Sequence, residues 1–180
     1  TIEAMPQTPS SIGRPTQIDD RLKVSIINSL ALLHEARDEI PMGIDVANKG
    51  ANVATNSVYN RRKLCETANR LGVVQSLGGK GGKAPDVPKY DHPILNVYSL
   101  LAQAELPTGS LPTDQVKTLT DKAVEIMNTD LGTWLDTQDW EGMTQEAFDE
   151  IMEMQAECWT RLSRVRIVLG DIHGSQEVAE

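Results

Sequence analysis

The chain of 180 residues has few aromatic residues, cysteines and histidines, and it has no long hydrophobic run. Aromatic residues make up 4% of it, and there are two Cys and three His. Two cysteines are too few for a disulfide framework, and no histidine stands with Cys or carboxylates at the spacing of zinc ligands. The apolar runs fall far short of the roughly 18 residues that cross a membrane. We therefore expect no disulfide scaffold, no metal site and no membrane partner.

Residues 1–17 do not have the pattern of a secretory signal. They are rich in Pro, Ser and Thr, and they have no basic start followed by an apolar stretch. Pro and Gly interrupt residues 1–15, which we expect to form a flexible arm. The sequence therefore predicts a cytoplasmic protein in which Cys65 and Cys158 are reduced thiols.

No set of residues in the sequence supports a named reaction. The Gly-rich segment at 78–83 does not fit a nucleotide-binding P-loop, because three residues instead of four separate Gly78 from Gly82 and Lys83. Ala84 also stands where that loop needs a hydroxyl group for magnesium. The sequence predicts a protein that is not an enzyme and that needs no cofactor.

Positive charge is scarce in the second half of the chain. The formal net charge of the whole chain is -9. Residues 1–100 carry 12 Lys and Arg against 10 Asp and Glu, whereas residues 101–180 carry 5 against 16. Within the first part, residues 41–90 hold eight bases and three acids. Such a basic island on an acidic protein is a candidate anion-binding face. The alternative is a solvated face without a partner.

Hydrophobic periodicity predicts three helices in the first half. The first begins at Thr16, which can cap it. It carries apolar residues at helical spacing, namely Leu22, Ile26, Leu30 and Leu33. A short helix at 44–49 and a longer one that starts at 55 or 56 follow, and Gly50 and Gly72 are expected to stop them.

The next segments predict a hairpin-like region with one undecided element. Residues 73–77 are prone to form a strand, and the Gly/Lys-rich residues 78–85 cannot form a helix and read as a loop. Residues 94–98 pair back as a second strand, or they start a helix that is entered through Pro93. The sequence leaves both alternatives open.

The second half reads as a linker followed by two long helices. Residues 106–112 contain Pro and Gly and are the best domain boundary. Helices are predicted at 113–131 and at 144–170, the second of them starting at Thr144. Their apolar stripes are too large for two helices to cover alone, so we expect self-association. The eight acids without a base in 136–157 are a solvated face, or a surface for a basic protein partner.

Residues 46–64, VANKGANVATNSVYNRRKL, resemble the helix-turn-helix of DNA-binding regulators. In this resemblance Ala47 faces its partner helix, Gly50 makes the turn, and Val58 packs inward from the recognition helix. The turn is one residue longer than in the common pattern. A helix before this motif and a strand, a Gly/Lys loop and a possible second strand after it are the order of a winged-helix domain. The resemblance covers roughly residues 16–100.

The resemblance implies duplex DNA as the ligand. Small polar residues at the start of the recognition helix would reach base edges, the basic residues after them would meet bases or phosphates, and the Gly/Lys loop would be the wing. The implied DNA-binding residues are Thr55, Asn56, Ser57, Tyr59, Asn60, Arg61, Arg62, Lys63, Lys80 and Lys83. The alternatives are a three-helix core with a surface loop and no nucleic acid, and a winged helix that binds protein.

The predicted fold is mainly α, with a winged helix-turn-helix domain followed by a long helical pair. The predicted division is a flexible arm at 1–15, the winged helix-turn-helix domain at 16–105, a linker at 106–112, an acidic helical oligomerisation region at 113–170 and a tail at 171–180.

This domain order, together with the GRPT sequence at 13–16, is similar to small terminase subunits of tailed bacteriophages and to transcription regulators. The resemblance implies a non-enzymatic protein that binds DNA for packaging or for transcription regulation. It would form a homo-oligomer through its C-terminal helices. The alternative is a structural or adaptor protein, such as a virion assembly component, that binds protein or nucleic acid without sequence specificity.

Overall fold

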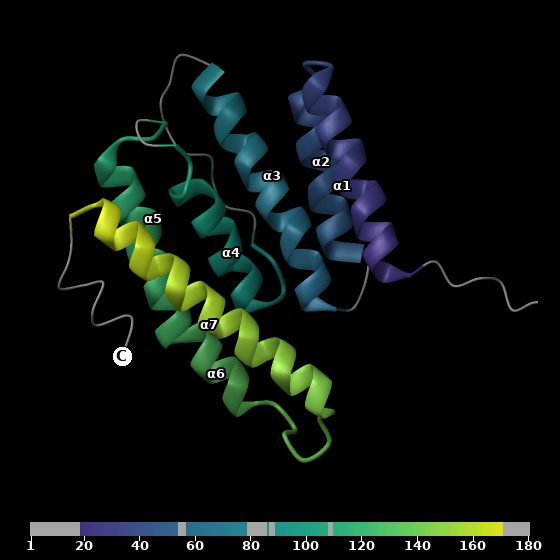
Figure 1. Cartoon of the computed structure of the whole chain (residues 1–180), viewed down its shortest axis with the longest axis vertical. Helices are drawn as coiled ribbons and strands as arrows, with labels where there is room; N and C mark the ends of the chain where they lie inside the picture. The colour runs from purple at the N-terminus through teal and green to yellow at the C-terminus, as the bar shows by residue number, and fades with distance from the viewer. Residues whose placement is uncertain (1–18, 54–56, 79–85, 87–88, 108–109, 171–180) are drawn as a thin grey trace, which may run out of the picture.

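The computed structural model describes residues 19–53, 57–78, 86, 89–107 and 110–170. Within these ranges the protein consists of α-helices and contains no strand (Figure 1). The predicted mainly α class is therefore confirmed. The helices are α1 (Asp20–Ala36), α2 (Ile40–Val53), α3 (Val58–Gly78), α4 (Pro93–Ala104), α5 (Thr113–Asn128), α6 (Asp130–Asp136) and α7 (Gln145–Val168).

Helices α1, α2 and α3 lie side by side and alternate in direction, with α1 at the outer edge of the molecule (Figure 1). Asp19 caps α1 by accepting a hydrogen bond from the backbone N–H of Arg21 at 3.0 Å, so the predicted cap at Thr16 is wrong. Ala47 is fully buried, as the sequence predicts, and it shares a cluster with Ala31 and Ala68. These small side chains allow the three helices to approach closely.

Helix α2 runs through Gly50 to Val53, so the predicted turn at Gly50 is wrong. Gly50 is buried where α2 contacts both α1 and α3. A Cβ atom at this position would lie 2.6 Å from Ile27 Cγ2 and 2.9 Å from Leu64 Cδ1. The glycine therefore allows close helix packing, and the break between α2 and α3 comes after Val53.

Helix α3 continues past Gly72 to Gly78, so both its predicted end and the predicted strand at 73–77 are wrong. Val73 is fully buried in the largest hydrophobic cluster. The β propensity of this short segment is overridden because helical geometry places Val73 in the core. Most of the Gly/Lys-rich segment at 78–85 lies outside the described residues.

Residues 94–98 belong to α4, so the helical alternative is confirmed. The helix is entered through Pro93, and His92 caps it because its Nδ1 accepts a hydrogen bond from the Ile94 backbone N–H at 3.2 Å. Both segments that were candidates for strands beside a wing are thus helical. The described part of the chain contains no strand that could frame a wing.

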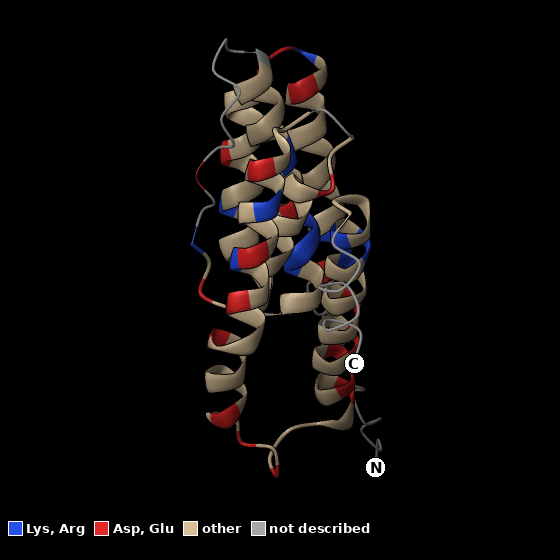
Figure 2. Cartoon of the chain, turned by 90° about the vertical axis from the view of Figure 1, so that its left-hand side faces the viewer, with Lys and Arg blue, Asp and Glu red and all other residues tan. Residues whose placement is uncertain are grey.

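Helix α7 begins where the sequence predicts, since the Thr144 hydroxyl accepts a hydrogen bond from the Ala147 backbone N–H at 3.3 Å. The helix predicted at 113–131 is divided at Thr129, where α5 ends and the short α6 begins. In Figure 2 the end of the molecule where the chain passes from α6 to α7 shows acidic residues, and most of the Lys and Arg residues lie at mid-height. The acidic stretch at 136–157 lies mainly at that end.

The largest buried cluster joins side chains from α3, α4, α5, α6 and α7. Its fully buried members include Tyr98, Leu131 and Leu162. Leu111 is also buried in this cluster, so the core continues across the segment 106–112. A division into separate domains at that segment stays a prediction.

Candidate functional site

The predicted DNA-binding residues that the structure describes lie on the first turns of α3 and just before it. Ser57, Tyr59 and Asn60 are half-buried, and Lys63 is exposed. The Ser57 hydroxyl accepts a hydrogen bond from the Asn60 backbone N–H at 3.3 Å, which is the geometry of a helix cap. Other predicted contacts lie outside the described residues, namely Thr55, Asn56, Lys80 and Lys83.

Arg61 is buried, with 7% of its side chain exposed. Its Nε donates a hydrogen bond to the carbonyl oxygen of Ala51 in α2. Its Nη1 and Nη2 donate to the two carboxylate oxygens of Asp91 at 3.3 and 2.6 Å, and these hydrogen bonds lower the pKa of Asp91. Arg61 therefore joins α2, α3 and the segment before α4, and it does not face solvent as a phosphate contact would.

Arg62 points toward α7. Its guanidinium carbon lies 4.2 Å from the centre of the Tyr59 ring, and Nη1 donates to the Tyr98 hydroxyl at 3.3 Å. The same Nη1 forms an ion pair with Glu157 of α7. Stacking on the ring and pairing with a carboxylate are two uses for which a planar guanidinium is well suited.

Arg161 of α7 lies at the centre of the same cluster. It forms ion pairs with Glu66 at 2.5 Å, with Glu105 at 2.5 Å and with Glu157 at 3.5 Å. Burial raises the pKa of Glu66, and the nearby positive charge of Arg161 opposes this shift. The cluster links α3, α7 and the end of α4 through charges that are paired within the fold. Local sequence patterns do not reveal this cluster, because the partners of its ion pairs stand up to 95 residues apart in the chain.

Most of the bases of the predicted basic island that the structure describes are paired with acids. Lys49 pairs with Asp45 at 2.7 Å, and Arg70 pairs with Glu35 at 2.8 Å. Together with Arg61 and Arg62, four of the six described bases in 41–90 form ion pairs. Within the described ranges no ion pair involves the other two, which are Lys63 and Lys89.

Four large apolar side chains are exposed on one face of α1, and they are the residues whose helical spacing predicts this helix. The exposed fractions are 52% for Leu22, 55% for Ile26, 43% for Leu30 and 50% for Leu33, and we call these four residues the outer stripe. The opposite face of α1 is the buried one, through Val24, Asn28 and Ala31. A group of large apolar side chains on one exposed face is a candidate interaction surface.

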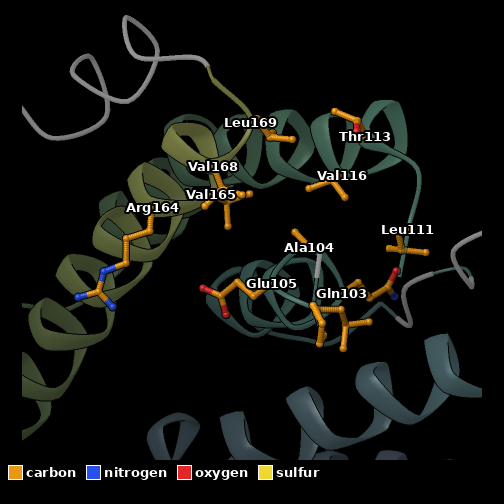
Figure 3. A pocket seen from close by; sticks show the side chains of 12 residues that line it. Gln103, Ala104, Glu105, Leu111, Thr113, Val116, Arg164, Val165, Val168 and Leu169 are labelled. Carbon is orange, nitrogen blue, oxygen red and sulfur yellow. The ribbon is translucent and has the colours of Figure 1, made fainter. Parts of the chain in front are cut away.

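A cavity of about 440 Å³ opens between the end of α4, the start of α5 and the end of α7 (Figure 3). Its walls are mainly apolar, and the side chain of Arg164 points away from it in Figure 3. Glu105, which also lines it, is held by Arg161. The cavity fits an apolar group. Its apolar lining includes Ala104, Leu111, Val116, Val165, Val168 and Leu169.

Both cysteines and His92 are buried. Burial raises the pKa values of Cys65 and Cys158 to about 12, so both thiols are protonated at neutral pH and are poor nucleophiles. Burial lowers the pKa of His92 to about 4, and its ring packs 4.2 Å from that of Trp134. In the described ranges no three metal-ligating side chains come together, and none of the helices there is long and apolar enough to cross a bilayer.

Comparison of the chain with family models, with curated proteins and with solved structures finds no match in any of the three. The resemblance to winged-helix DNA-binding proteins consequently stays a prediction.

Proposed function

We propose that this chain is a non-enzymatic structural or adaptor protein that acts by assembling with copies of itself. The observation that carries the proposal is the outer stripe of α1, where four large apolar side chains are each about half exposed on one helix face. A soluble monomer rarely leaves such a group in water, because each side chain gains free energy when it is covered. The acidic end at α6 and α7 is the proposed surface for a basic partner.

Two further exposed apolar sites, one at each end of α7, support assembly through the C-terminal helices. Ile167 and Val168, at the end of α7, are 56% and 73% exposed. Trp140 and Phe148, on either side of the start of α7, are 41% and 38% exposed and contact each other edge to face at 5.7 Å. Self-association can therefore use the outer stripe of α1 or the exposed apolar side chains of α7.

Duplex DNA binding by a winged helix-turn-helix, as in a small terminase subunit or a transcription regulator, is the second candidate. Ser57, Asn60 and Lys63 follow one another at intervals of three residues, which favours a polar strip along the start of α3. The first proposal is preferred because Arg61 and Arg62, the central bases of the predicted interface, are paired inside the fold.

Sedimentation equilibrium on the full chain tests the first proposal. A mass that rises with concentration between about 1 and about 100 µM supports self-association, and a monomer at about 100 µM contradicts it. Salt titration of duplex binding tests the second candidate. Binding that weakens steeply above about 50 mM salt, and that is lost in a Lys63→Ala/Lys80→Ala/Lys83→Ala variant, would favour DNA. No binding at about 50 mM salt would exclude it.

A further inference from the structure

The outer stripe of α1 is a continuous apolar face with a charge at each end. At about 100° per residue, Leu22, Ile26, Leu30 and Leu33 all lie within an arc of about 80°. Asp19 and Arg37 stand 18 residues apart, which is about five turns and about 27 Å, so they fall on the same line of the helix surface. Both are exposed. The face thus has an acid before the stripe and a base after it.

The charges at the two ends of the stripe match those of a second copy only when the two α1 helices run antiparallel. In an antiparallel pair centred on the stripe, Leu22 meets Leu33 and Ile26 meets Leu30 of the second copy, and Asp19 meets Arg37 at both ends. In a parallel pair Asp19 would meet Asp19 and Arg37 would meet Arg37, and like charges repel. The antiparallel pair has two-fold symmetry, so every contact is made twice.

We infer that a second copy of this chain docks on the outer stripe, with the two α1 helices antiparallel and with Asp19 of each copy beside Arg37 of the other. The inference rests on the proposed function, since it names the surface through which the chain assembles. Helix α1 lies at the outer edge of the molecule (Figure 1), and the four side chains of the stripe are 43–55% exposed.

The first experiment compares two double variants in sedimentation equilibrium. Ile26→Glu/Leu30→Glu places charges in the centre of the stripe and should raise the dimer Kd at least about 100-fold. Ile167→Glu/Val168→Glu makes the same change at the end of α7 and tests the competing surface. If the pair forms through α1, this variant keeps the dimer Kd within about two-fold of the wild type, and if the pair forms through α7, this variant loses the dimer and Ile26→Glu/Leu30→Glu keeps it. Because all four side chains are at least 43% exposed, both variants should keep the helical circular dichroism spectrum of the wild type.

The second experiment tests the direction of the pair by cysteine cross-linking. Leu22→Cys chains mixed with Leu33→Cys chains should form a disulfide-linked dimer, and neither variant should do so alone. The native Cys65 and Cys158 are buried and do not compete. A charge change at the other end adds a control that leaves the Asp19 cap of α1 intact: Arg37→Glu should weaken the dimer, and Arg37→Lys, which keeps the positive charge, should not.

The outcomes separate the inference from the function on which it rests. If the wild type dimerises but only Ile167→Glu/Val168→Glu abolishes the dimer, self-association stands and docking on α1 is wrong. If Leu22→Cys alone cross-links, the antiparallel arrangement is wrong. If the wild type is monomeric at about 100 µM, both are wrong, and another protein or residues 1–18 would be the partner of the stripe.

Discussion

Replacing Arg61 by Ala should destabilise the folded protein, although Arg61 belongs to a basic run that is typical of a DNA-binding surface. The side chain is buried and its Nε donates to the Ala51 carbonyl, while its terminal nitrogens pair with Asp91. If the side chain faced DNA, its removal would weaken binding and leave stability unchanged. The two interpretations therefore predict different free energies of unfolding for the variant, which can be measured without any ligand.

Three contributions set the expected loss. The Ala51 carbonyl loses its donor, which costs about 1–3 kcal/mol for a buried acceptor. The three methylene groups of the arginine stem lose contacts worth roughly 0.8 kcal/mol each. The pair with Asp91 adds at most about 1 kcal/mol, because the Asp91 side chain is 69% exposed. The desolvation of the guanidinium, which the variant avoids, offsets part of this sum. A net decrease of about 2–4 kcal/mol in the free energy of unfolding is expected, or roughly 4–16 °C in Tm.

Urea denaturation followed by circular dichroism measures this change. Lys63→Ala is the matched control, since Lys63 is exposed on the same helix and its removal should change stability by less than about 0.5 kcal/mol. Asp91→Asn should fall between the two, because the amide oxygen still accepts one hydrogen bond. An Arg61→Ala midpoint equal to that of the wild type would refute the burial of this side chain.

Three further predictions concern other buried positions. Burial holds the pKa of His92 at about 4, below its unfolded value of about 6.5, so the unfolded chain binds the extra proton and stability falls as pH decreases from about 6.5 to about 4. His92→Asn keeps an acceptor at the helix cap and should remove this part of the pH dependence in urea denaturation. Cys65 and Cys158 should resist a thiol reagent at pH about 8 in the native protein and both react in urea, and rapid native labelling would contradict their burial. Gly50→Ala should lower the free energy of unfolding by about 1–3 kcal/mol, because the added Cβ would clash with Ile27. Gly132→Ala is the control, and with open space around it the variant should raise this free energy by up to about 1 kcal/mol. Equal effects of the two variants would show that α2 does not pack closely at Gly50.

The sequence predicts helices well where local chemistry decides them. Thr144 caps α7, and the apolar spacing that follows carries the helix almost to its predicted end. At Gly50 and Gly72 the same kind of local reasoning fails, because a glycine that ends a helix and a glycine that lets two helices touch look alike in one sequence. The atoms that decide at Gly50 belong to Ile27 and Leu64, which are distant in the chain.

The orientation of α1 was not predictable from periodicity alone. The helix has apolar residues on two opposite faces, one with Val24 and Ala31 and the other with the outer stripe, and period counting selects the larger side chains. The structure buries the smaller ones instead, because Val24 and Ala31 allow α2 and α3 to come close. Small residues opposite large ones are therefore the signal that indicates which face packs internally.

The candidate DNA interface rests on the charge count over one stretch of sequence, residues 41–90. Such a count leaves out the charged residues that the fold brings in from elsewhere in the chain. The excess of five bases over acids in 41–90 is real along the chain. In the fold Asp91, Glu35 and Glu157 come from outside that window to pair with Arg61, Arg70 and Arg62. A polyanion responds to the summed field of the surface, and an opposite charge within a few ångströms cancels most of the field of each base. Part of the acidity of the C-terminal half is therefore the counter-charge of the basic island, supplied by a residue 95 positions away.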